Sequence, residues 1–475
     1  MKRSGAFILV LALTAAGCAV NQDEEVARYR RIVDIPTTQP IAAPADGAPL
    51  TLRDALLLAN QQNERLSFEG ENYLQALIDR RRAAAAFLPT ISLAPTYTFR
   101  DRSSGGADNP NTGAAGSAAR TEIFDAPVAG EMNLFNGFGD VARYRASGAT
   151  IEQRRALLLD LQEQLLLDVA DVYYQVLRSE ESVRVLENSL KVQEARLRDV
   201  RGRRAAGTAR PLDVAQVEAQ TSETRVSLLA ARNDVRTGRA LLEFLTAAPI
   251  GDAPLVDEYA VPEQLPHADE LQATALQRRR DLQAAEAATR AARQNVEAAV
   301  SQYYPSVTLD ANVFLYRESS PTDRDWDAVL RANLPIFSAG LIQADVREAW
   351  SLFRQAMLAA SETRRQVRRD VDVAYGDLTF SAQRMAELRT QLAAAQQAFE
   401  QAARSNEVGL ATNLERLVAQ DQLLTSQLAF VSEEFNQKLS SLNLLRATGS
   451  LRERLESLPA TTQPTTRPTV VSDAR

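Results

Sequence analysis

Few residues of the chain have the chemistry that catalysis or metal binding requires. Its 475 residues include one cysteine, Cys18, and one histidine, His267. A lone histidine cannot form a histidine-based metal cluster, and no glycine-rich phosphate loop or Ser/His/Asp set can be assembled around it. With Pro266 beside it, His267 is interpreted as a surface residue at the end of a linker. We therefore expect no enzyme, no bound metal and no cofactor, apart from a modification of Cys18.

Cys18 stands where an N-terminal export signal ends. Two basic residues precede an apolar stretch at residues 6–13, which is shorter than the ~20 residues of a membrane-spanning helix. The sequence AAGC that ends at Cys18 resembles the lipobox of bacterial lipoproteins, with alanine in place of the usual leucine. The resemblance implies cleavage after residues 1–17, lipidation of the thiol with palmitate among the lipids and, since Ala19 follows, sorting to the outer membrane. The alternative is an ordinary signal peptide with a chance cysteine.

The charge of the chain argues against nucleic acid as a partner. The formal net charge is −7, and arginines are mixed with glutamates along the predicted helices instead of forming a basic stripe. A mildly acidic, solvated surface is the simpler interpretation. Residues 18–50 and 458–475 are rich in Pro, Thr and Ala and are expected to be a lipidated linker and a disordered tail.

Between these ends the chain contains two copies of one unit. Matching residues of the copies are 202 positions apart, namely Tyr173 and Tyr375, Gly207 and Gly409, and Asp213 and Glu415. An internal repeat of this length means that one structural unit is built twice. We place the first copy at residues 51–250, a linker at 251–266 and the second copy at 267–457.

Each copy is predicted to contain a helix (52–87 in the first), two extended segments around a loop, and a long helical hairpin. The extended segments, at about 90–102, 122–135, 306–317 and 325–337, alternate apolar and polar residues as half-buried strands do. Their length suits a tilted membrane-spanning strand of about 9–11 residues; the alternative is a soluble sheet packed on its apolar face. The positions expected to face lipid are Leu93, Tyr97, Leu309, Val313, Trp326 and Leu330.

The helix that follows the second extended segment is unusually long. No proline interrupts residues 140–206, and the leucines and valines there recur at intervals of three and four, as in a coiled coil. At ~1.5 Å per residue this helix is roughly 100 Å long, far more than the ~30 Å hydrocarbon layer of a bilayer. Because it also carries charge throughout, we expect it to lie in water, between two membranes.

Each long helix is predicted to turn back on itself at a hairpin tip, at about 205–213 and 407–415. Gly207 and Gly409 occupy the position just past a helix end, where a left-handed conformation is cheap only for glycine. Pro211 suits the first turn of a returning helix. Asp213 and Glu415 then lie in the first turn of the returning helices, where the helix dipole favours negative charge.

Four strands cannot form a closed membrane barrel alone. An open sheet leaves unpaired edges in lipid, and bacterial membrane barrels typically have at least about eight strands. The chain must therefore oligomerise if its strands cross a membrane. Two copies would supply eight strands and three would supply twelve, and the residues alone do not choose between them.

The duplicated unit resembles a known family. The strand exits MNLFNGFGD and ANLPIFSAGL and the paired tips GTARPLD and GLATNLE are similar to those of TolC-like outer membrane efflux proteins, over about residues 50–457. The resemblance implies a mainly α fold with a membrane β-barrel portion. A homotrimer would form a 12-stranded outer membrane barrel and a long periplasmic α-helical barrel. It also implies two protein partners, a periplasmic adaptor (membrane fusion protein) and an inner membrane transporter.

The resemblance assigns roles to the hairpin tips, which would close the periplasmic entrance until the adaptor docks. The residues expected to shape the tips and the adaptor grooves are Gly207, Leu212, Gly409, Leu410 and Leu414. Asp213 and Glu415 are candidates for an acidic ring at the constriction that attracts cations; alternatively they only begin helices. Family members often have a basic residue in the second tip that bonds the acid of the first, but Ala411 and Thr412 stand there instead.

The function expected from these residues and this resemblance is that of an outer membrane channel in a tripartite efflux pump. The channel would be a lipid-anchored, passive exit duct for drugs, metals or other small molecules. One alternative is an exit duct for type I protein secretion. Another is a lipid-anchored periplasmic coiled-coil spacer without a pore, which leaves the alternating segments unexplained. The sequence does not identify the cargo, because a wide duct needs no dedicated binding pocket.

Overall fold

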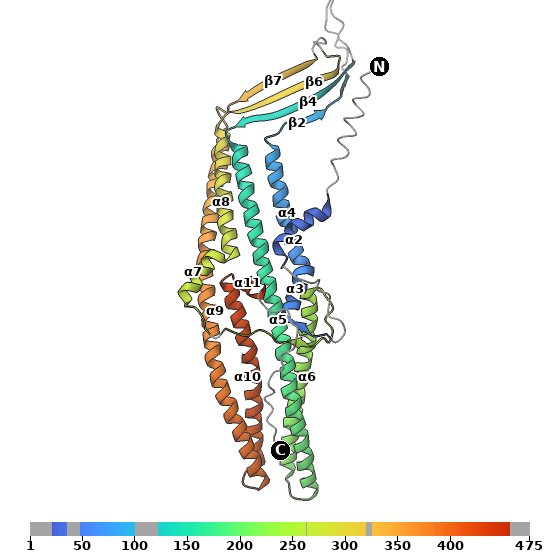
Figure 1. The fold of residues 1–475 in the computed structure, drawn as a ribbon, viewed down its shortest axis with the longest axis vertical. Coiled ribbons are helices and arrows are strands. Elements are labelled where there is room, and N and C mark those ends of the chain that lie inside the picture. The colour runs from blue at the N-terminus through green and yellow to red at the C-terminus, as the bar shows by residue number, and fades with distance from the viewer. Residues whose placement is uncertain (1–20, 36–47, 100–121, 263, 320–324, 457–475) are drawn as a thin grey trace, which may run out of the picture. The chain divides into compact units, whose positions relative to one another are not determined.

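The two copies of the repeat adopt the same order of elements in the computed structural model (Figure 1). The structure describes residues 21–35, 48–99, 122–262, 264–319 and 325–456. The first copy contains α3 (Leu52–Gln62), α4 (Glu64–Ala85), β2 (Thr90–Leu93), β3 (Thr96–Phe99), β4 (Glu122–Asn136), α5 (Gly139–Ala205) and α6 (Pro211–Thr246). The second copy contains α7 (Ala268–Arg278), α8 (Arg280–Val300), β6 (Ser306–Arg317), β7 (Trp326–Asn333), α9 (Leu341–Glu407) and α10 (Asn413–Ala447). Helices α5 and α9 each have 67 residues.

A bend divides the first helix of each copy. Asn63 separates α3 from α4 in the first copy, and Arg279 separates α7 from α8 in the second. Both residues leave the helical conformation, with ψ of 123° and 124°. At Asn63 the side chain replaces lost helical bonds, because its amide donates to the carbonyl of Leu245 at 3.1 Å and its Oδ1 accepts from the N–H of Arg65 at 3.0 Å. The helix predicted at 52–87 is therefore two helices.

Prolines limit the two outer strands. The strand predicted at 90–102 is interrupted at Pro95, which divides it into β2 and β3, and its last three residues lie outside the described part of the chain. The strand predicted at 325–337 ends at Asn333, before Pro335. Proline has no backbone N–H to donate within a sheet, so it is compatible with the interruption or end of a strand but not with a continuous ladder.

Strands β2, β3, β4, β6 and β7 form one antiparallel sheet in which β4 and β6 are central (Figure 1). β2 and β3 pair with different halves of β4, β4 pairs with β6, and β6 pairs with β7. The sheet therefore has four strand positions, with β2 and β3 sharing one edge. The register between β4 and β6 shifts at 126–127 and at 133–135. Such irregularities increase the local twist of a long strand.

The segment at 18–50, predicted as a linker, contains helix α2 (Gln22–Val33). Asn21 caps this helix, because its side chain accepts from the first backbone N–H groups. Tyr29 is buried against Gly70 of α4, where a Cβ atom would lie 2.4 Å from the ring. Helix α2 was not predicted because it buries only a tyrosine and a valine, too few for a periodic apolar pattern.

The segment between the copies, predicted as a linker at 251–266, contains strand β5 (Leu255–Val256). It pairs in parallel with β1 (Leu50–Thr51), which precedes α3. The buried hydroxyl of Tyr173 lies 2.7 Å from a carbonyl oxygen of each strand and accepts the N–H of Val256 at 2.9 Å. This hydroxyl therefore fastens both short strands to α5.

The chain forms two compact units, and neither corresponds to one copy of the repeat. Unit 1 comprises the described residues within 1–72, 156–283 and 362–475, and unit 2 comprises those within 73–155 and 284–361. Unit 1 contains both hairpin tips and a short terminal helix, α11 (Leu451–Glu456), whereas unit 2 contains the sheet. Among the described residues, no helix combines the length and the hydrophobicity that crossing a bilayer requires.

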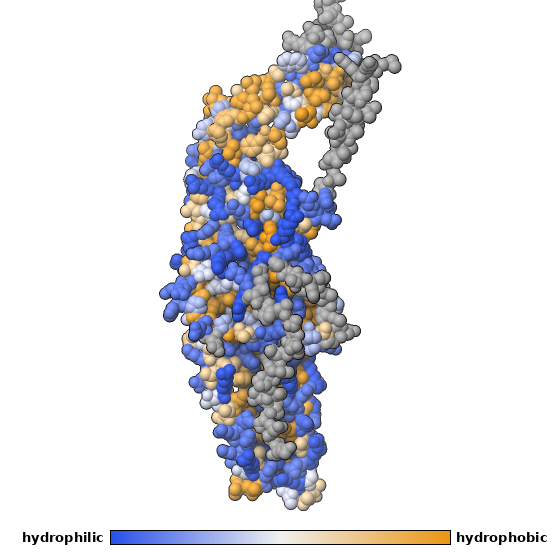
Figure 2. All heavy atoms as spheres, in the orientation of Figure 1, coloured by the Kyte–Doolittle hydropathy of each residue, from blue (hydrophilic) through white to orange (hydrophobic). Residues whose placement is uncertain are grey.

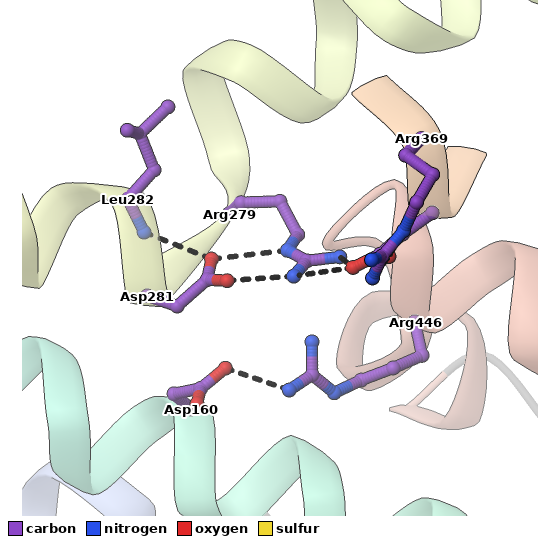
Figure 3. A network of polar contacts seen from close by, with 7 residues as sticks. Asp160, Arg279, Asp281, Leu282, Arg369 and Arg446 are labelled. Carbon is purple, nitrogen blue, oxygen red and sulfur yellow. Dashed lines mark hydrogen bonds and ion pairs between the residues drawn. The ribbon is translucent and has the colours of Figure 1, made fainter. Parts of the chain in front are cut away.

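Buried ion pairs join helices α5, α8, α9 and α10 within unit 1. Arg279, at the bend between α7 and α8, has 8% of its side chain exposed and donates to Asp281 at 2.6 Å and to Asp370 of α9 at 3.3 Å (Figure 3). Beside it, Arg446 of α10 pairs with Asp160 of α5 at 2.7 Å. Loss of one partner would leave a charge buried without compensation, which is strongly destabilising. These pairs therefore specify which helix segments meet.

Candidate functional site

The first hairpin tip is the turn between α5 and α6. Helix α5 ends at Ala205, and Gly207 follows with a φ of +75°, in the left-handed region that favours glycine. The N–H of Thr208 donates back to the carbonyl of Arg203 at 2.8 Å, which closes the helix end. Leu212, in the first turn of α6, is 56% exposed. The tip is thus a tight turn with an apolar side chain directed to its surface.

The second hairpin tip repeats this geometry between α9 and α10. Gly409 has a φ of +79°, and the N–H of Leu410 donates to the carbonyl of Ser405 at 2.8 Å. Leu410 and Leu414 are 85% and 56% exposed. Together with the leucine of the first tip, they offer apolar surface to another molecule.

Asp213 and Glu415 both cap the helices that they begin. Asp213 accepts from the backbone N–H of Arg210 at 3.1 Å and pairs with its guanidinium at 3.0 Å, and this side chain lowers the pKa of the Asp213 carboxyl. Glu415 accepts from the backbone N–H of Thr412 at 2.6 Å, which lowers the pKa of the Glu415 carboxyl. In return, the Thr412 hydroxyl accepts from the N–H of Glu415 at 3.2 Å. Their role in a pore ring stays a prediction.

A buried arginine of the first hairpin bonds the second tip. Arg196 of α5 is 9% exposed and donates to Oδ1 of Asn406 at 2.6 Å and to Oδ1 of Asn413 at 3.4 Å. Its other terminal nitrogen pairs with Asp199 at 2.8 Å. Burial, followed by the nearby charge of Arg416, lowers the pKa of Arg196. Because Asn406 and Asn413 stand on either side of the second turn, this one side chain holds both ends of the tip against the first hairpin.

The two hairpins also share a small apolar cluster next to this arginine. Its buried members are Leu197, Val200, Val214, Val217 and Leu417. Only Leu417 comes from the second hairpin. Further along, Gln220 of α6 donates to Asp421 of α10 at 3.3 Å. The contact between the hairpins near their tips is therefore small, and polar bonds make up much of it.

Arg196 is the residue of the site that sequence analysis missed. In the second tip the sequence offers only Arg416, which lies beyond the turn, as a basic partner, whereas the bonding arginine is on the first hairpin. A signal was present in the sequence, because Arg196 lies beside Leu197 in a seam of buried leucines and valines. A charged residue at a buried position needs a partner, but only the fold shows which one.

One face of the sheet is apolar along registered rows. A row across all four strand positions consists of Leu93, Val128, Val313 and Trp326, and a second row on β6 and β7 consists of Leu309 and Leu330. Residues opposite each other in an antiparallel pair lie on the same face. Trp326, Leu330 and Val313 are 67%, 65% and 53% exposed. Figure 2 shows hydrophobic residues gathered over the strands.

Tyr97, the remaining position predicted to face lipid, lies on β3. Its ring contacts Phe124 of β4 with centroids 6.0 Å apart, and Phe124 contacts Tyr316 of β6 at 5.7 Å. The predicted positions therefore lie in aromatic or aliphatic rows that cross from strand to strand. Whether these rows meet lipid stays a prediction.

The opposite face of β6 and β7 is mainly polar, although the apolar Val329 is opposite Asp310. Asp310 of β6 pairs with Arg331 of β7 at 3.7 Å, and the amide of Asn312 donates to Asp327 at 3.0 Å. These residues alternate with the apolar rows along the same strands. The sheet thus has the two different faces that a wall between an apolar and an aqueous phase requires.

The candidate lipidation residue, Cys18, and the export signal before it lie outside the described residues. So does the predicted tail at 458–475. Lipidation therefore stays a prediction.

The fold is that of TolC-like channels. The outer membrane protein VceC of Vibrio cholerae has a TM-score of 0.74 with this structure, with 84% of this chain and 96% of VceC covered at 20% identity. The predicted fold class, a mainly helical protein with long hairpins and a β portion, is confirmed.

The sequence defines the family more closely. The family model described as outer membrane efflux protein matches residues 72–248 and 271–450. The outer membrane efflux protein BepC of Brucella suis is 28% identical over 323 residues, which cover 67% of this chain and 70% of BepC. The probable efflux pump outer membrane protein TtgC of Pseudomonas putida is 30% identical over 310 residues, which cover 60% of each chain. This chain belongs to the outer membrane efflux protein family, and its function is that of an outer membrane exit duct.

Proposed function

We propose that three copies of the chain form the passive exit duct of a tripartite efflux pump, across the outer membrane and the periplasm. The observation that carries this proposal is the two-faced sheet, with apolar rows on one side and paired charges on the other. A wall with these faces separates lipid from a water-filled passage. The work of the duct is conduction, and the energy for export comes from an inner membrane transporter.

The edges of the sheet support assembly. Within the described residues, β2 and β3 pair only with β4, and β7 pairs only with β6. Unpaired backbone groups cost several kcal/mol each in lipid, so an open edge there must find a partner. Pairing β7 of one copy with β2 and β3 of the next satisfies both edges and closes a barrel. The resemblance to TolC-like proteins favours three copies, and therefore twelve strand positions.

The hairpin tips form the gate in this proposal. Arg196 holds the second tip against the first hairpin and keeps the entrance closed. The exposed leucines at the tips, Leu212, Leu410 and Leu414, receive the periplasmic adaptor. Docking of the adaptor competes with the few contacts between the hairpins, so that the tips separate and the entrance opens.

Two further parts of the proposal come from the sequence. Cys18 carries the lipid that fixes the N-terminus to the outer membrane, because it ends an export signal in a lipobox-like context. The cargo is a small molecule, since the two relatives named above are efflux proteins. Both parts are separable from the duct itself: Cys18→Ser should abolish incorporation of labelled palmitate and leave the conducting channel intact.

Conductance tests the duct against a spacer without a pore. The purified full chain, reconstituted in planar lipid bilayers, should produce discrete conductance steps. A preparation that is folded and trimeric by mass but conducts no current would contradict the proposal. It would favour a structural role for the long hairpins.

The faces of the sheet provide a matched pair of variants. Leu309→Arg places a charge on the apolar face, which costs about 2–4 kcal/mol at a bilayer midplane and should prevent insertion of the protein into the outer membrane. Asn312→Arg places the same charge on the polar face, beside Asp327, and should be tolerated. Membrane fractionation and heat-modifiable mobility on gels measure both. Equal insertion of the two variants would show that the apolar rows do not face lipid.

A further inference from the structure

A cleft in unit 2, lined by α4, α5 and α8, has an excess of positive charge. Its volume is about 600 Å³. Its charged lining residues are Arg80, Arg145, Arg290, Arg293, Glu152 and Glu297. Glu152 pairs with Arg290 at 2.6 Å. Three arginines therefore remain in the cleft with one glutamate.

Among the residues that the structure describes, no acidic side chain pairs with any of these three arginines. Arg145 and Arg293 form no ion pair with any residue that the structure describes. Arg80 donates to the Tyr144 hydroxyl at 3.1 Å, and its guanidinium lies 5.0 Å from the centroid of that ring. In the same lining, the buried Oε1 of Gln294 accepts no hydrogen bond from the described part of the chain. The cleft thus offers three cationic donors and one acceptor to a ligand.

An apolar cleft continues this one toward the sheet. The second cleft, of about 310 Å³, shares Arg145 and Glu297 with the first, and its other lining includes Phe138, Val141 and Tyr304. Phe138 contacts Phe135 edge to face, with ring centroids 5.3 Å apart. Phe135 is opposite Val307, which lies on the apolar face of β6. The charged cleft therefore leads, through an apolar one, to the face that the proposed function places in lipid.

The depth of the arginines matches the headgroup layer of a bilayer. Arg80 is five residues before the end of α4, Arg145 is six residues after the start of α5, and Arg293 is seven residues before the end of α8. At ~1.5 Å per residue, all three lie within their helices, about 7–11 Å from the helix ends nearest the strands. The headgroup layer adds about 5–8 Å on each side of the hydrocarbon. Arginine side chains are long enough to bridge the small difference.

We propose that the two clefts together bind one anionic phospholipid from the inner leaflet of the outer membrane, with its phosphate on Arg80, Arg145 and Arg293. A hydroxyl of the headgroup donates to Gln294, and the acyl chains pass over Phe138 toward the apolar face of the sheet. A ligand that is both anionic and amphipathic fits both clefts, whereas inorganic phosphate fits only the first. The inference rests on the proposed position of the sheet in the membrane.

Lipid retention by the purified full chain tests the site. The protein is reconstituted in mixed phosphatidylglycerol and phosphatidylcholine, washed with detergent, and the lipid that remains bound is measured by mass spectrometry. We expect the wild type to retain phosphatidylglycerol in preference to phosphatidylcholine. The double variant Arg145→Gln/Arg293→Gln should retain about tenfold less, since each basic residue near a membrane surface adds measurably to the attraction of anionic lipid.

Two matched variants show whether the charge of these particular arginines is responsible. Arg143→Gln removes an arginine from the same helix that is already paired with Asp140 at 2.8 Å, and it should leave retention unchanged. Arg145→Lys/Arg293→Lys keeps the charge and should restore most of the retention. Equal retention of the two lipids by the wild type, or undiminished retention in the double glutamine variant, would overturn the proposal.

Two further readouts separate the alternatives. Displacement of the bound lipid by soluble glycerol phosphate would assign the site to a free phosphate and overturn the lipid assignment. Conductance is recorded from the same preparations. Channels that conduct without retaining phosphatidylglycerol would contradict this inference alone, whereas the absence of conductance would contradict the proposed function.

Discussion

The two hairpin tips have the same backbone and different side-chain chemistry. Each places a glycine just past a 67-residue helix, with a φ of +75° at Gly207 and +79° at Gly409. Each begins the returning helix with an acid that caps it. The tips differ in the bond that joins them, because Arg196 belongs to the first hairpin and the equivalent position in the second is Ala398.

The positions that the two copies share are therefore not the positions that bond one hairpin to the other. The residues that shape each tip are shared by the copies, 202 positions apart. The residues that bond one hairpin to the other are not shared: Asn406 and Asn413, which accept from the arginine, correspond to Arg204 and Pro211. Because the two copies differ at these positions, the first hairpin supplies the arginine and the second supplies its acceptors. The positions that both copies share give the two turns the same backbone.

Arg196→Ala should have the largest effect on this comparison, because it removes the bond between the tips. Hydrogen bonds to charged groups contribute about 1.5–3 kcal/mol, and Asn406 and Asn413 both lose their cationic donor. We expect the conductance of the channel without adaptor to rise severalfold in planar bilayers. Arg203→Ala is the control, since it removes an exposed arginine of the same helix that pairs with Asp199 at 3.2 Å. Equal conductance of the two variants would show that the tips close without Arg196.

Glu415→Gln and Asp213→Asn test whether the two caps also form an acidic ring. Both substitutions keep an oxygen that can accept the capping N–H and remove the charge. If three copies of each acid surround the constriction, cation selectivity should fall in both variants, and further in the double variant. Reversal potentials under a salt gradient measure it. Unchanged selectivity and unchanged opening would leave both acids as helix caps alone.

Gly207→Ala and Gly409→Ala test the part that the tips share. Apart from the adjacent residues, no atom lies within 4 Å of a Cβ built at either glycine, so the main cost is the positive φ. That cost is about 1 kcal/mol for a residue with a side chain. We expect hydrogen exchange near each substituted turn to accelerate about fivefold, by similar factors in the two variants. A large difference between them would mean that the turns are not equivalent.

Thr412→Ala should have the smallest effect and should be confined to the second tip. Loss of a threonine N-cap costs about 1 kcal/mol. Of the two returning helices, α10 has this cap and α6 does not, because α6 begins with Pro211 after an arginine. Hydrogen exchange should accelerate in the first turn of α10 and stay unchanged in α6. Acceleration in both helices would indicate that the tips are coupled more tightly than their few shared bonds suggest.

Much of the fold can be predicted from the sequence, because the sequence pattern is periodic and occurs twice. The seam of leucines and the absence of proline predict α5, and the offset of 202 then predicts α9. Alternation predicts β4 and β6 with nearly their observed ends. Gly207 and Gly409 mark both turns, because few other residues tolerate a positive φ. These features depend on local chemistry, which a sequence carries directly.

The parts that escaped prediction depend on contacts between distant segments. The bond from Arg196 to Asn406 joins residues 210 positions apart. Helix α2 packs on α4 through Tyr29, whose ring fits because Gly70 has no side chain. The compact units also mix segments of both copies, which the boundaries of a repeat do not reveal.

The most direct test of the account is a cross-link that replaces the bond of Arg196. Gln220 and Asp421, whose side chains lie 3.3 Å apart, are changed to cysteine in the Arg196→Ala channel and joined with a short bis-maleimide. Gln220→Cys alone in the same background, treated in the same way, is the control. If the closed entrance depends on holding the two hairpins together, cross-linking should return the raised conductance to the wild-type level. Conductance that is not raised by Arg196→Ala, or that stays raised after cross-linking, would contradict the account.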